Sequence, residues 1–317
     1  AGGSVRYLIF PDANAEYDGI VKELRAHIER GSFPKKELAL LFRTNQGQRR
    51  MVEALMKANI PFRMKDHLPN LYEHWIAKDI FAYFALSRGS NERSDLLRVM
   101  NRPKRYLSRE LLTEDTFAFD VLEEAVSEKP WIAERLTDLR IDLRHLSRMN
   151  PFAGINYIRK GIGYDDFLPE YAEYRGIRSE ELFDVLSELQ DAARGFRTLE
   201  EFKGHIEEYT EELARQAKDM GKQADAVTLS TLHSSKGLEY GCVYLVDVNE
   251  GVMPYRKAVL PEDLEEERRM VYVGMTRAKK SLTLCAVKET GSRGTLPSPY
   301  LKECQKRSET VVNPGFL

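Results

Sequence analysis

The sequence has few cysteines, no long apolar run and little net charge, and each of these absences excludes a class of protein. Its three cysteines, Cys242, Cys285 and Cys304, lie far apart in 317 residues, which excludes a disulfide framework and predicts no metal site. No apolar run approaches the length of a membrane helix, and the N-terminus has no signal-peptide pattern. We therefore expect a cytoplasmic protein with no membrane partner. A net charge of −2 provides no global field for nucleic acid, so such contacts would need local patches.

The sequence also lacks the loop GxxxxGK[ST] that binds the β-phosphate of nucleoside triphosphates. No apolar strand is followed by the paired acids that hold Mg²⁺. The chain by itself is therefore not expected to hydrolyse ATP.

Apolar patterning predicts an α/β fold whose sheet domain is interrupted by helices. A near-continuous apolar run such as 37–42 is typical of a strand in a parallel sheet that is covered on both faces. We expect strands at 5–10, 37–42, 61–64, 226–230, 243–246 and 282–287. Helical spacing predicts further helices beside them at 15–30, 48–58, 76–86 and 265–275. Gly31 is expected to end the first of these helices.

Between about residues 90 and 224 the strand signal disappears. Helices are predicted there at 115–127, 131–149, 151–160, 179–195 and 198–220, the last opening with a capping box formed by Thr198 and Glu201. The expected organisation is a discontinuous parallel-sheet domain (5–89 and 225–290), an all-helical insertion (90–224) and an irregular C-terminal tail (291–317).

Three stretches carry a resemblance to a known family. TLHSSKGLEY (231–240) and EEERRMVYVGMTRAKKSLTL (265–284) resemble motifs V and VI of the UvrD, PcrA and Rep type of superfamily 1 DNA helicases, and LALLFRTNQGQRRMVEALMKANIPFRM (38–64) resembles motif IV. The resemblance implies the C-terminal half of an ATP-dependent 3′–5′ DNA helicase, with a second RecA-like lobe and a helical insertion. It implies an N-terminal lobe of the same protein as partner, which would hold ATP and Mg²⁺.

The resemblance also implies roles in nucleotide binding. Arg277 and Arg43 match the positions of γ-phosphate arginines and are the catalytic candidates, since an arginine cannot lose its proton near a phosphate. Phe42 falls where the family stacks an aromatic ring, usually Tyr, on the adenine. Glu239 matches the position that hydrogen-bonds the ribose, and Gly237 is assigned to nucleotide binding with it.

A second group of residues is implied in DNA binding at single strands and duplex junctions. His233 matches a position that contacts single-stranded DNA, and Thr231, Ser234 and Ser235 suit contacts to the phosphate backbone. Lys236 either binds phosphate or pairs with an acidic group of motif VI.

A basic segment in the predicted insertion is the strongest local candidate for further DNA contacts, with a solvated loop as the alternative. Its members are Arg98, Arg102, Lys104, Arg105 and Arg109, with Tyr106 among them. The family usually continues NxPKR with a Gly-Ile-Gly turn, whereas here Tyr106, Leu107 and Ser108 follow.

Two alternatives to the helicase hypothesis stay open from the sequence. One is a binding or regulatory module that keeps the fold and DNA contacts without catalysis. The other is a helicase lobe of a nuclease-linked enzyme.

Overall fold

The computed structural model describes residues 3–218, 225–256, 258–290 and 293–305. Contacts divide the chain into two compact units, which we call the sheet unit (residues 1–68 and 212–317) and the helical unit (residues 69–211). Both divisions fall earlier in the chain than the boundaries near 90 and 224 that the sequence suggests. The reason for the first is that α3 (Trp75–Ser87) packs against helices of the helical unit rather than on the sheet.

The sheet unit contains the parallel sheet that the sequence predicts. Its parallel strands run in the order β1-β6-β5-β2-β4-β3, and a short β7 pairs antiparallel with β6. Their bounds are β1 (Ser4–Asp12), β2 (Leu38–Phe42), β3 (Phe62–Met64), β4 (Val227–Thr231), β5 (Tyr240–Leu245), β6 (Ala278–Thr290) and β7 (Arg293–Gly294). The predicted fold class, a parallel α/β sheet with a helical region inserted in it, is confirmed.

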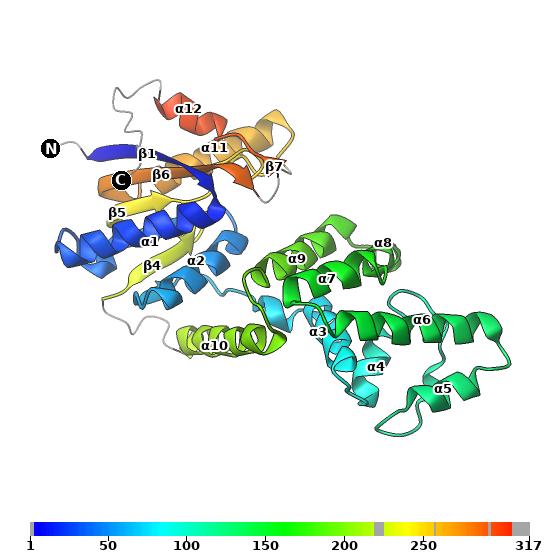
Figure 1. The fold of residues 1–317 in the computed structure, drawn as a ribbon. Helices are drawn as coiled ribbons and strands as arrows, with labels where there is room; N and C mark the ends of the chain where they lie inside the picture. Colours follow the sequence, from blue (N-terminus) through cyan, green and yellow to red (C-terminus); the bar gives the residue numbers. More distant parts are fainter. Residues whose placement is uncertain (1–2, 219–224, 257, 291–292, 306–317) are drawn as a thin grey trace. The chain divides into compact units, whose positions relative to one another are not determined.

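Helices cover both faces of this sheet (Figure 1). α1 (Ala13–Glu29) and α2 (Asn45–Lys57) lie on one face, and α11 (Pro261–Met275) and α12 (Pro299–Gln305) lie on the other. α1 begins after Asp12, whose carboxylate accepts the Ala15 N–H at 2.9 Å, and it ends before Gly31, which has φ +63°. The predicted glycine stop is therefore confirmed.

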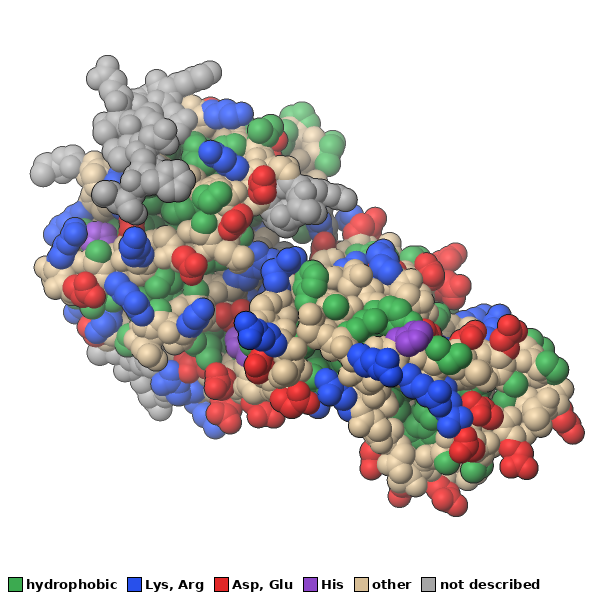
Figure 2. Space-filling model, viewed as in Figure 1, with side chains coloured by type: hydrophobic (Ala, Val, Ile, Leu, Met, Phe, Trp, Pro, Cys, Tyr) green, Lys and Arg blue, Asp and Glu red, His purple; other side chains and the backbone are tan. Residues whose placement is uncertain are grey.

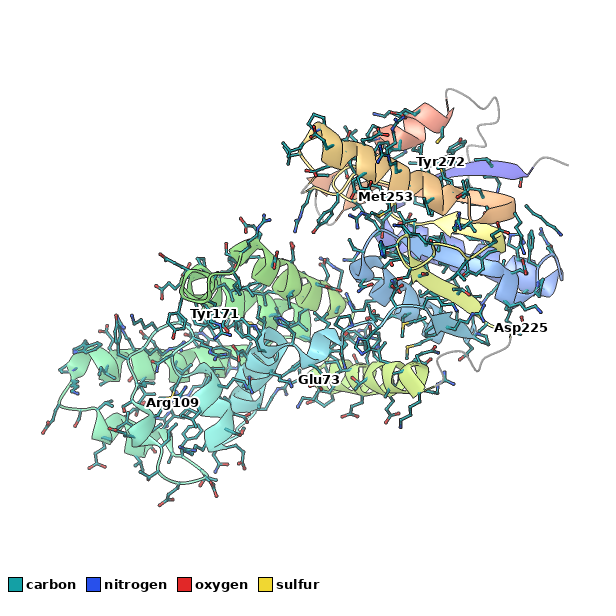
Figure 3. The ribbon with its side chains drawn as sticks, turned by 180° about the vertical axis from the view of Figure 1, so that it is seen from behind. Glu73, Arg109, Tyr171, Asp225, Met253 and Tyr272 are labelled. Atoms are coloured by element: carbon teal, nitrogen blue, oxygen red, sulfur yellow. The ribbon has the colours of Figure 1, made fainter. Side chains whose placement is uncertain are left out.

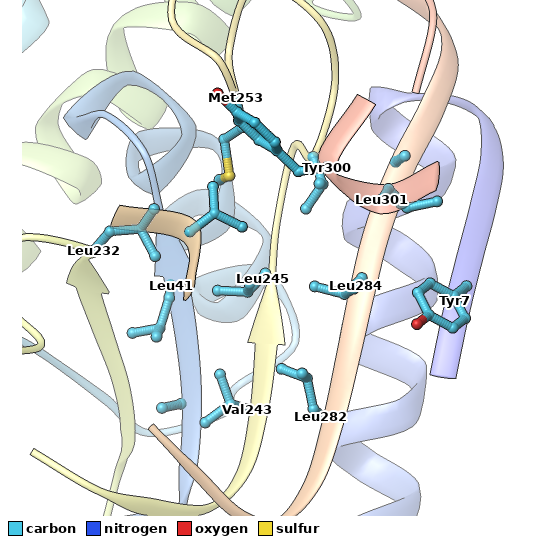
Figure 4. Close-up of a cluster of buried hydrophobic side chains, with 14 of the residues drawn as sticks. Tyr7, Leu41, Leu232, Val243, Leu245, Met253, Leu282, Leu284, Tyr300 and Leu301 are labelled. Carbon is cyan, nitrogen blue, oxygen red and sulfur yellow. The ribbon is translucent and has the colours of Figure 1, made fainter. Parts of the chain in front are cut away.

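The core beneath α11 and α12 is built from alternate residues of neighbouring strands, because successive side chains point to opposite faces. Leu41, Leu245 and Leu284 face one another there (Figure 4). Gly274 of α11 lies close against Leu232 and Leu245. A Cβ at Gly274 would lie 2.4 Å from Leu232, so the helix reaches the sheet at this distance only with glycine.

The described part of the predicted tail is not irregular. β6 continues to Thr290, and α12 places Tyr300 and Leu301 in the same core (Figure 4). Ser298 begins this helix, since its hydroxyl accepts the Tyr300 N–H at 3.2 Å. The sequence did not predict α12, because Tyr300 and Leu301 are a short apolar pair in a segment rich in Gly, Ser and Pro and give too weak a helical periodicity.

The helical unit is formed by helices, with two short 3₁₀ turns, Leu71–Glu73 and Arg109–Leu111, in the parts described. Its helices are α3, α4 (Arg93–Val99), α5 (Phe119–Ala125), α6 (Pro130–Leu146), α7 (Pro151–Lys160), α8 (Tyr164–Arg175), α9 (Ser179–Ala192) and the first turns of α10 (Leu199–Lys218). The predicted capping box of α10 is present: Glu201 N–H donates to the Thr198 hydroxyl at 3.1 Å, and Thr198 N–H donates back to the Glu201 carboxylate at 3.4 Å.

The sequence interpretation missed α4 and α8, and α8 carries Pro169 inside it. Tyr171 of α8, labelled in Figure 3, packs on Trp75 with ring centroids 4.6 Å apart. Among the described helices, none is both long enough and apolar enough to cross a membrane.

Candidate nucleotide and DNA sites

The predicted site residues of the sheet unit divide between the two edges of the parallel sheet. All strands of a parallel sheet end at one edge, which we call the carboxyl edge, and begin at the other, the amino edge. Phe42 pairs in register with Thr231 at the carboxyl edge, whereas Tyr240 pairs with Ala278 at the amino edge. Arg43 and the turn that follows Thr231 therefore lie at one edge, and Glu239 and Arg277 lie at the other.

At the amino edge, Arg277 is held by backbone groups. Its Nε donates to the Val273 carbonyl at 2.9 Å, and one terminal nitrogen donates to the Leu238 carbonyl at 3.1 Å. The carbonyl of Arg277 in turn accepts the Tyr240 N–H at 2.8 Å. These bonds join the end of α11 to the segment containing Glu239, so the two residues predicted to contact γ-phosphate and ribose are neighbours.

A pocket of about 320 Å³ opens beside Glu239. Its walls carry the cationic side chains of Lys36, Arg63 and Lys65, together with Glu37 and Tyr240. The Lys279 ammonium lies 3.0 Å from the Glu37 carboxylate and lowers its pKa through this hydrogen bond. The exposed Glu239 therefore shares a pocket with cations that sequence patterning did not single out, because they come from separate segments of the chain.

Arg43 does not join Arg277. Its guanidinium binds the carboxylate of Glu267 on α11. Nε lies 2.9 Å and 3.1 Å from the two carboxylate oxygens, and a terminal nitrogen donates a further hydrogen bond. Arg277 lies level with the start of β5 and Arg43 level with its end, and a strand of this length spans about 20 Å at roughly 3.3 Å per residue. The position of Glu267 on α11 agrees, since ten residues of helix to Arg277 rise about 15 Å.

Arg43 and Arg277 are thus held by different partners in this structure, and the expectation that both reach one phosphate stays a prediction. Glu267 is buried, and its carboxylate also accepts the Tyr255 N–H at 3.1 Å. The hydrogen bond to Glu267 raises the pKa of Arg43. Arg43 therefore ties β2 to α11.

Phe42 requires a correction. Its ring is 1% exposed and packs against Gly47 at the start of α2. It closes the core at the end of β2, and its buried ring presents no face to an adenine in this structure.

At the carboxyl edge, the turn after β4 is organised by Asp66, a residue that the sequence interpretation missed. The Asp66 carboxylate accepts the Thr231 N–H at 2.7 Å, the Thr231 hydroxyl at 3.0 Å and the Ser234 hydroxyl. Both predicted phosphate-binding hydroxyls are thus engaged within the protein. His233 and Lys236 are exposed, and within the described part of the chain Lys236 forms no ion pair with motif VI.

Ser235 differs from its neighbours in the turn. It is completely buried, and its hydroxyl donates to the Leu232 carbonyl at 2.8 Å. Its predicted phosphate contact is corrected to a structural role in closing the turn.

Two acids that sequence reasoning also missed, the buried Glu16 and the partly buried Asp247, lie near the carboxyl edge. Glu16 of α1 is fully buried and accepts the backbone N–H of Asp247 at 3.1 Å, and Tyr17 donates to Asp247 at 3.0 Å. Burial and the neighbouring Asp247 raise the pKa of Glu16 well above its ordinary value, and burial raises the pKa of Asp247. Nothing in the strand pattern distinguishes such a pair from exposed acids.

The basic segment of the helical unit separates into structural and exposed residues. Arg105 is 5% exposed and donates to the carbonyls of Val99 and Pro103, at 3.1 Å and 3.3 Å. Its predicted DNA contact is therefore corrected. Arg102 binds the buried Asp79, which also accepts the Tyr164 hydroxyl at 2.7 Å. Lys104 remains exposed.

The fold and these sites define a RecA-like lobe with a helical insertion, and the comparisons with known proteins assign it to a family. The sequence profile of the UvrD-like helicase C-terminal domain matches residues 1–124 and 136–289. The chain belongs to this family.

Curated relatives agree with this assignment. The chain is 28% identical to the ATP-dependent DNA helicase Rep of Escherichia coli (strain K12) over 95% of its own length and 48% of that protein's. It is 29% identical to the ATP-dependent DNA helicase PcrA of Leuconostoc citreum over 89% of its length and 40% of that protein's. The chain thus spans about half the length of the curated relatives it matches, or less.

Proposed function

We propose that this chain is the C-terminal part of an ATP-dependent DNA helicase that moves 3′ to 5′ along one strand. Its family membership and the names of Rep and PcrA support helicase activity in a longer protein. The proposal assigns the Walker A and Walker B elements, and with them the Mg²⁺ ion, to an N-terminal lobe. This chain by itself would not turn over ATP, because its sequence has no loop for the β-phosphate.

The amino edge is the proposed nucleotide-facing surface. This proposal depends on how the guanidinium of Arg277 is held. Each of its three nitrogens makes one hydrogen bond, to Val273, Leu238 and Thr276. A guanidinium has five N–H donors, so two remain for a γ-phosphate oxygen while the other three hold the side chain in place. A preoriented cation of this kind stabilises the charge that spreads over the phosphoryl oxygens during transfer.

Glu239 and Gly237 complete the proposed nucleotide site. The Glu239 carboxylate can accept hydrogen bonds from ribose hydroxyls, and the nearby cations of the pocket offset its charge beside a polyphosphate. Gly237 has φ +79°, a conformation that favours glycine and turns the chain from the carboxyl edge toward Glu239.

The metal is not assigned to this chain. Within the residues described, no three His, Cys, Asp or Glu side chains gather as metal ligands would. When bound, Mg²⁺ would neutralise phosphate charge, and the residues here contribute cations and hydrogen-bond groups around the same nucleotide.

The carboxyl edge is the proposed DNA-facing surface. His233 and Lys236 project from the turn that Asp66 holds, and their contacts would go to the DNA backbone, which positions a strand without reading its sequence. The turn from Thr231 to Glu239 links the two edges directly. Closure of the two lobes on ATP would therefore affect both ends of this one short segment. ATP stabilises the arrangement of the lobes that it binds more tightly.

The decisive experiment uses the intact helicase. Arg277→Ala should lower DNA-stimulated ATP turnover by roughly 10³-fold or more while ATP still binds, because the arginine acts mainly on the charge of the transition state. Arg25→Ala is the matched control, since Arg25 is an exposed arginine on α1 that donates a hydrogen bond to the Ala58 carbonyl. Turnover in Arg277→Ala equal to that of the control would remove the assignment.

A further inference from the structure

Two large aromatic side chains are exposed side by side in the helical unit. Tyr106, in the loop after α4, is 51% exposed, and Trp131, in the first turn of α6, is 49% exposed. Their ring centroids lie 5.4 Å apart in an edge-to-face arrangement. Neither ring serves the core of the unit, so folding does not explain why two such residues meet at the surface.

The loop that carries Tyr106 is fixed by buried polar groups. The side chain of Asn101 accepts the N–H groups of Arg105 and Leu107, at 3.2 Å and 3.1 Å, and donates to the Leu107 carbonyl at 2.8 Å. Arg105 fills the space beneath the loop, bonded to its carbonyls. Tyr106 itself adopts φ +62°, which is costly for a bulky residue and turns its ring outward. The ring is thus held in place before any ligand arrives.

Two cations flank the rings. The Lys104 ammonium lies 5.0 Å from the Tyr106 centroid, and the Arg135 guanidinium lies 5.1 Å from Tyr106 and 5.5 Å from Trp131. Arg135 also donates to the Lys104 carbonyl at 3.3 Å. In the part of the chain that the structure describes, neither cation forms a salt bridge, so both charges are available to an anion. Figure 2 shows that basic and acidic side chains are interspersed over the face of the chain that it presents.

We propose that Tyr106, Trp131, Lys104 and Arg135 form a binding surface for single-stranded DNA. Unpaired bases stack on the two rings, and the backbone phosphates lie against the two cations. Aromatic platforms flanked by positive charge bind single strands in this way with little sequence preference, because every base has a π-face. A duplex offers few free base faces. The choice of DNA as the nucleic acid rests on the proposed helicase function, whereas the surface is defined by its own geometry.

The test uses the fluorescence of Trp131 in the full chain. The protein has two tryptophans, and Trp75→Phe leaves Trp131 as the only one while keeping a ring against Tyr171. A single-stranded oligonucleotide is expected to quench this fluorescence saturably, and an equally long blunt duplex is expected to leave it nearly unchanged. Tyr106→Ala and, separately, Arg135→Ala should each weaken binding of the single strand by about fivefold or more at fixed salt.

Controls separate this surface from the rest of the chain. Tyr174→Ala removes another exposed aromatic of the same unit, 85% exposed on α8, and should leave affinity unchanged. Circular dichroism of each variant must match that of the parent. Quenching that is saturable and lost in Tyr106→Ala supports the proposal.

Two results would overturn it. In the first, the single strand binds with a dependence on His233 while Trp131 is not quenched and Tyr106→Ala has no effect; this removes the aromatic surface and leaves the proposed helicase function intact. In the second, Trp131 fluorescence changes with protein concentration in the absence of DNA, which identifies the rings as an interface between protein copies. Failure of the helicase proposal would be seen separately, in the turnover of Arg277→Ala.

Discussion

The Arg43–Glu267 pair leads to a prediction that distinguishes a structural arginine from a phosphate-binding one. The carboxylate side chain is 7% exposed and the arginine side chain 21%, and their contact is bidentate. In Arg43→Met the buried Glu267 carboxylate would keep, among the described residues, only the Tyr255 N–H as a hydrogen-bond partner. Breaking a buried pair by removing one member costs about 3–5 kcal/mol, and we expect about 3 kcal/mol here, because partial exposure allows some rehydration.

The reverse change should cost less. In Glu267→Leu the arginine, being more exposed, can turn to water, and a loss of about 2 kcal/mol is expected. The double variant removes both charges and should lose less than the sum of the single changes, with a coupling free energy of about 2 kcal/mol.

Urea unfolding followed by circular dichroism measures these free energies. Hydrogen exchange of peptides from β2 and α11 assigns the loss to the sheet unit. A free surface arginine would change stability by no more than about 0.5 kcal/mol when removed. If Arg43→Met unfolds at the same urea concentration as the parent, and the coupling is near zero, the assignment of Arg43 to a structural clamp is refuted.

Two further predictions concern buried polar groups. Glu16→Gln should stabilise the sheet unit at about pH 8 and flatten the pH dependence of its stability. A carboxyl group whose pKa is raised on folding stabilises the native state fully below its unfolded pKa of about 4.3. This stabilisation is lost as the pH rises toward the folded pKa. Urea unfolding at about pH 5.5 and pH 8 measures the effect, and a parent whose stability rises with pH through this window while the variant does not would contradict it. Arg105→Ala should destabilise the helical unit by about 2–4 kcal/mol, since it removes the side-chain donor to the Pro103 carbonyl, leaves the Val99 carbonyl with only the Arg102 N–H, and opens a cavity. Lys104→Ala, an exposed neighbour, is its control, and equal melting temperatures for the two variants would argue against the buried role.

The sequence by itself determined the six strands of the parallel sheet in their chain order, and the identity of the family. Strands of almost unbroken apolar residues, such as Leu38–Phe42, are recognisable because a strand buried on both faces has no polar positions. The capping box at Thr198 and the stop at Gly31 are local signals, formed by neighbours in the chain, and both were predictable for that reason. The motif that contains Glu239 and the motif that contains Arg277 are likewise each formed by residues close in sequence.

Only the tertiary structure decided which charged and polar groups are free to act. Arg43 and Arg277 have similar motif contexts, yet the parallel sheet separates them, because one follows the end of a strand and the other precedes the start of one. Arg105 and Lys104 are adjacent in the chain, and burial assigns one to the core and leaves the other in solvent. Asp66 contacts Thr231 and Trp131 contacts Tyr106, residues that are distant from them in sequence. A one-dimensional pattern contains no information on such spatial contacts.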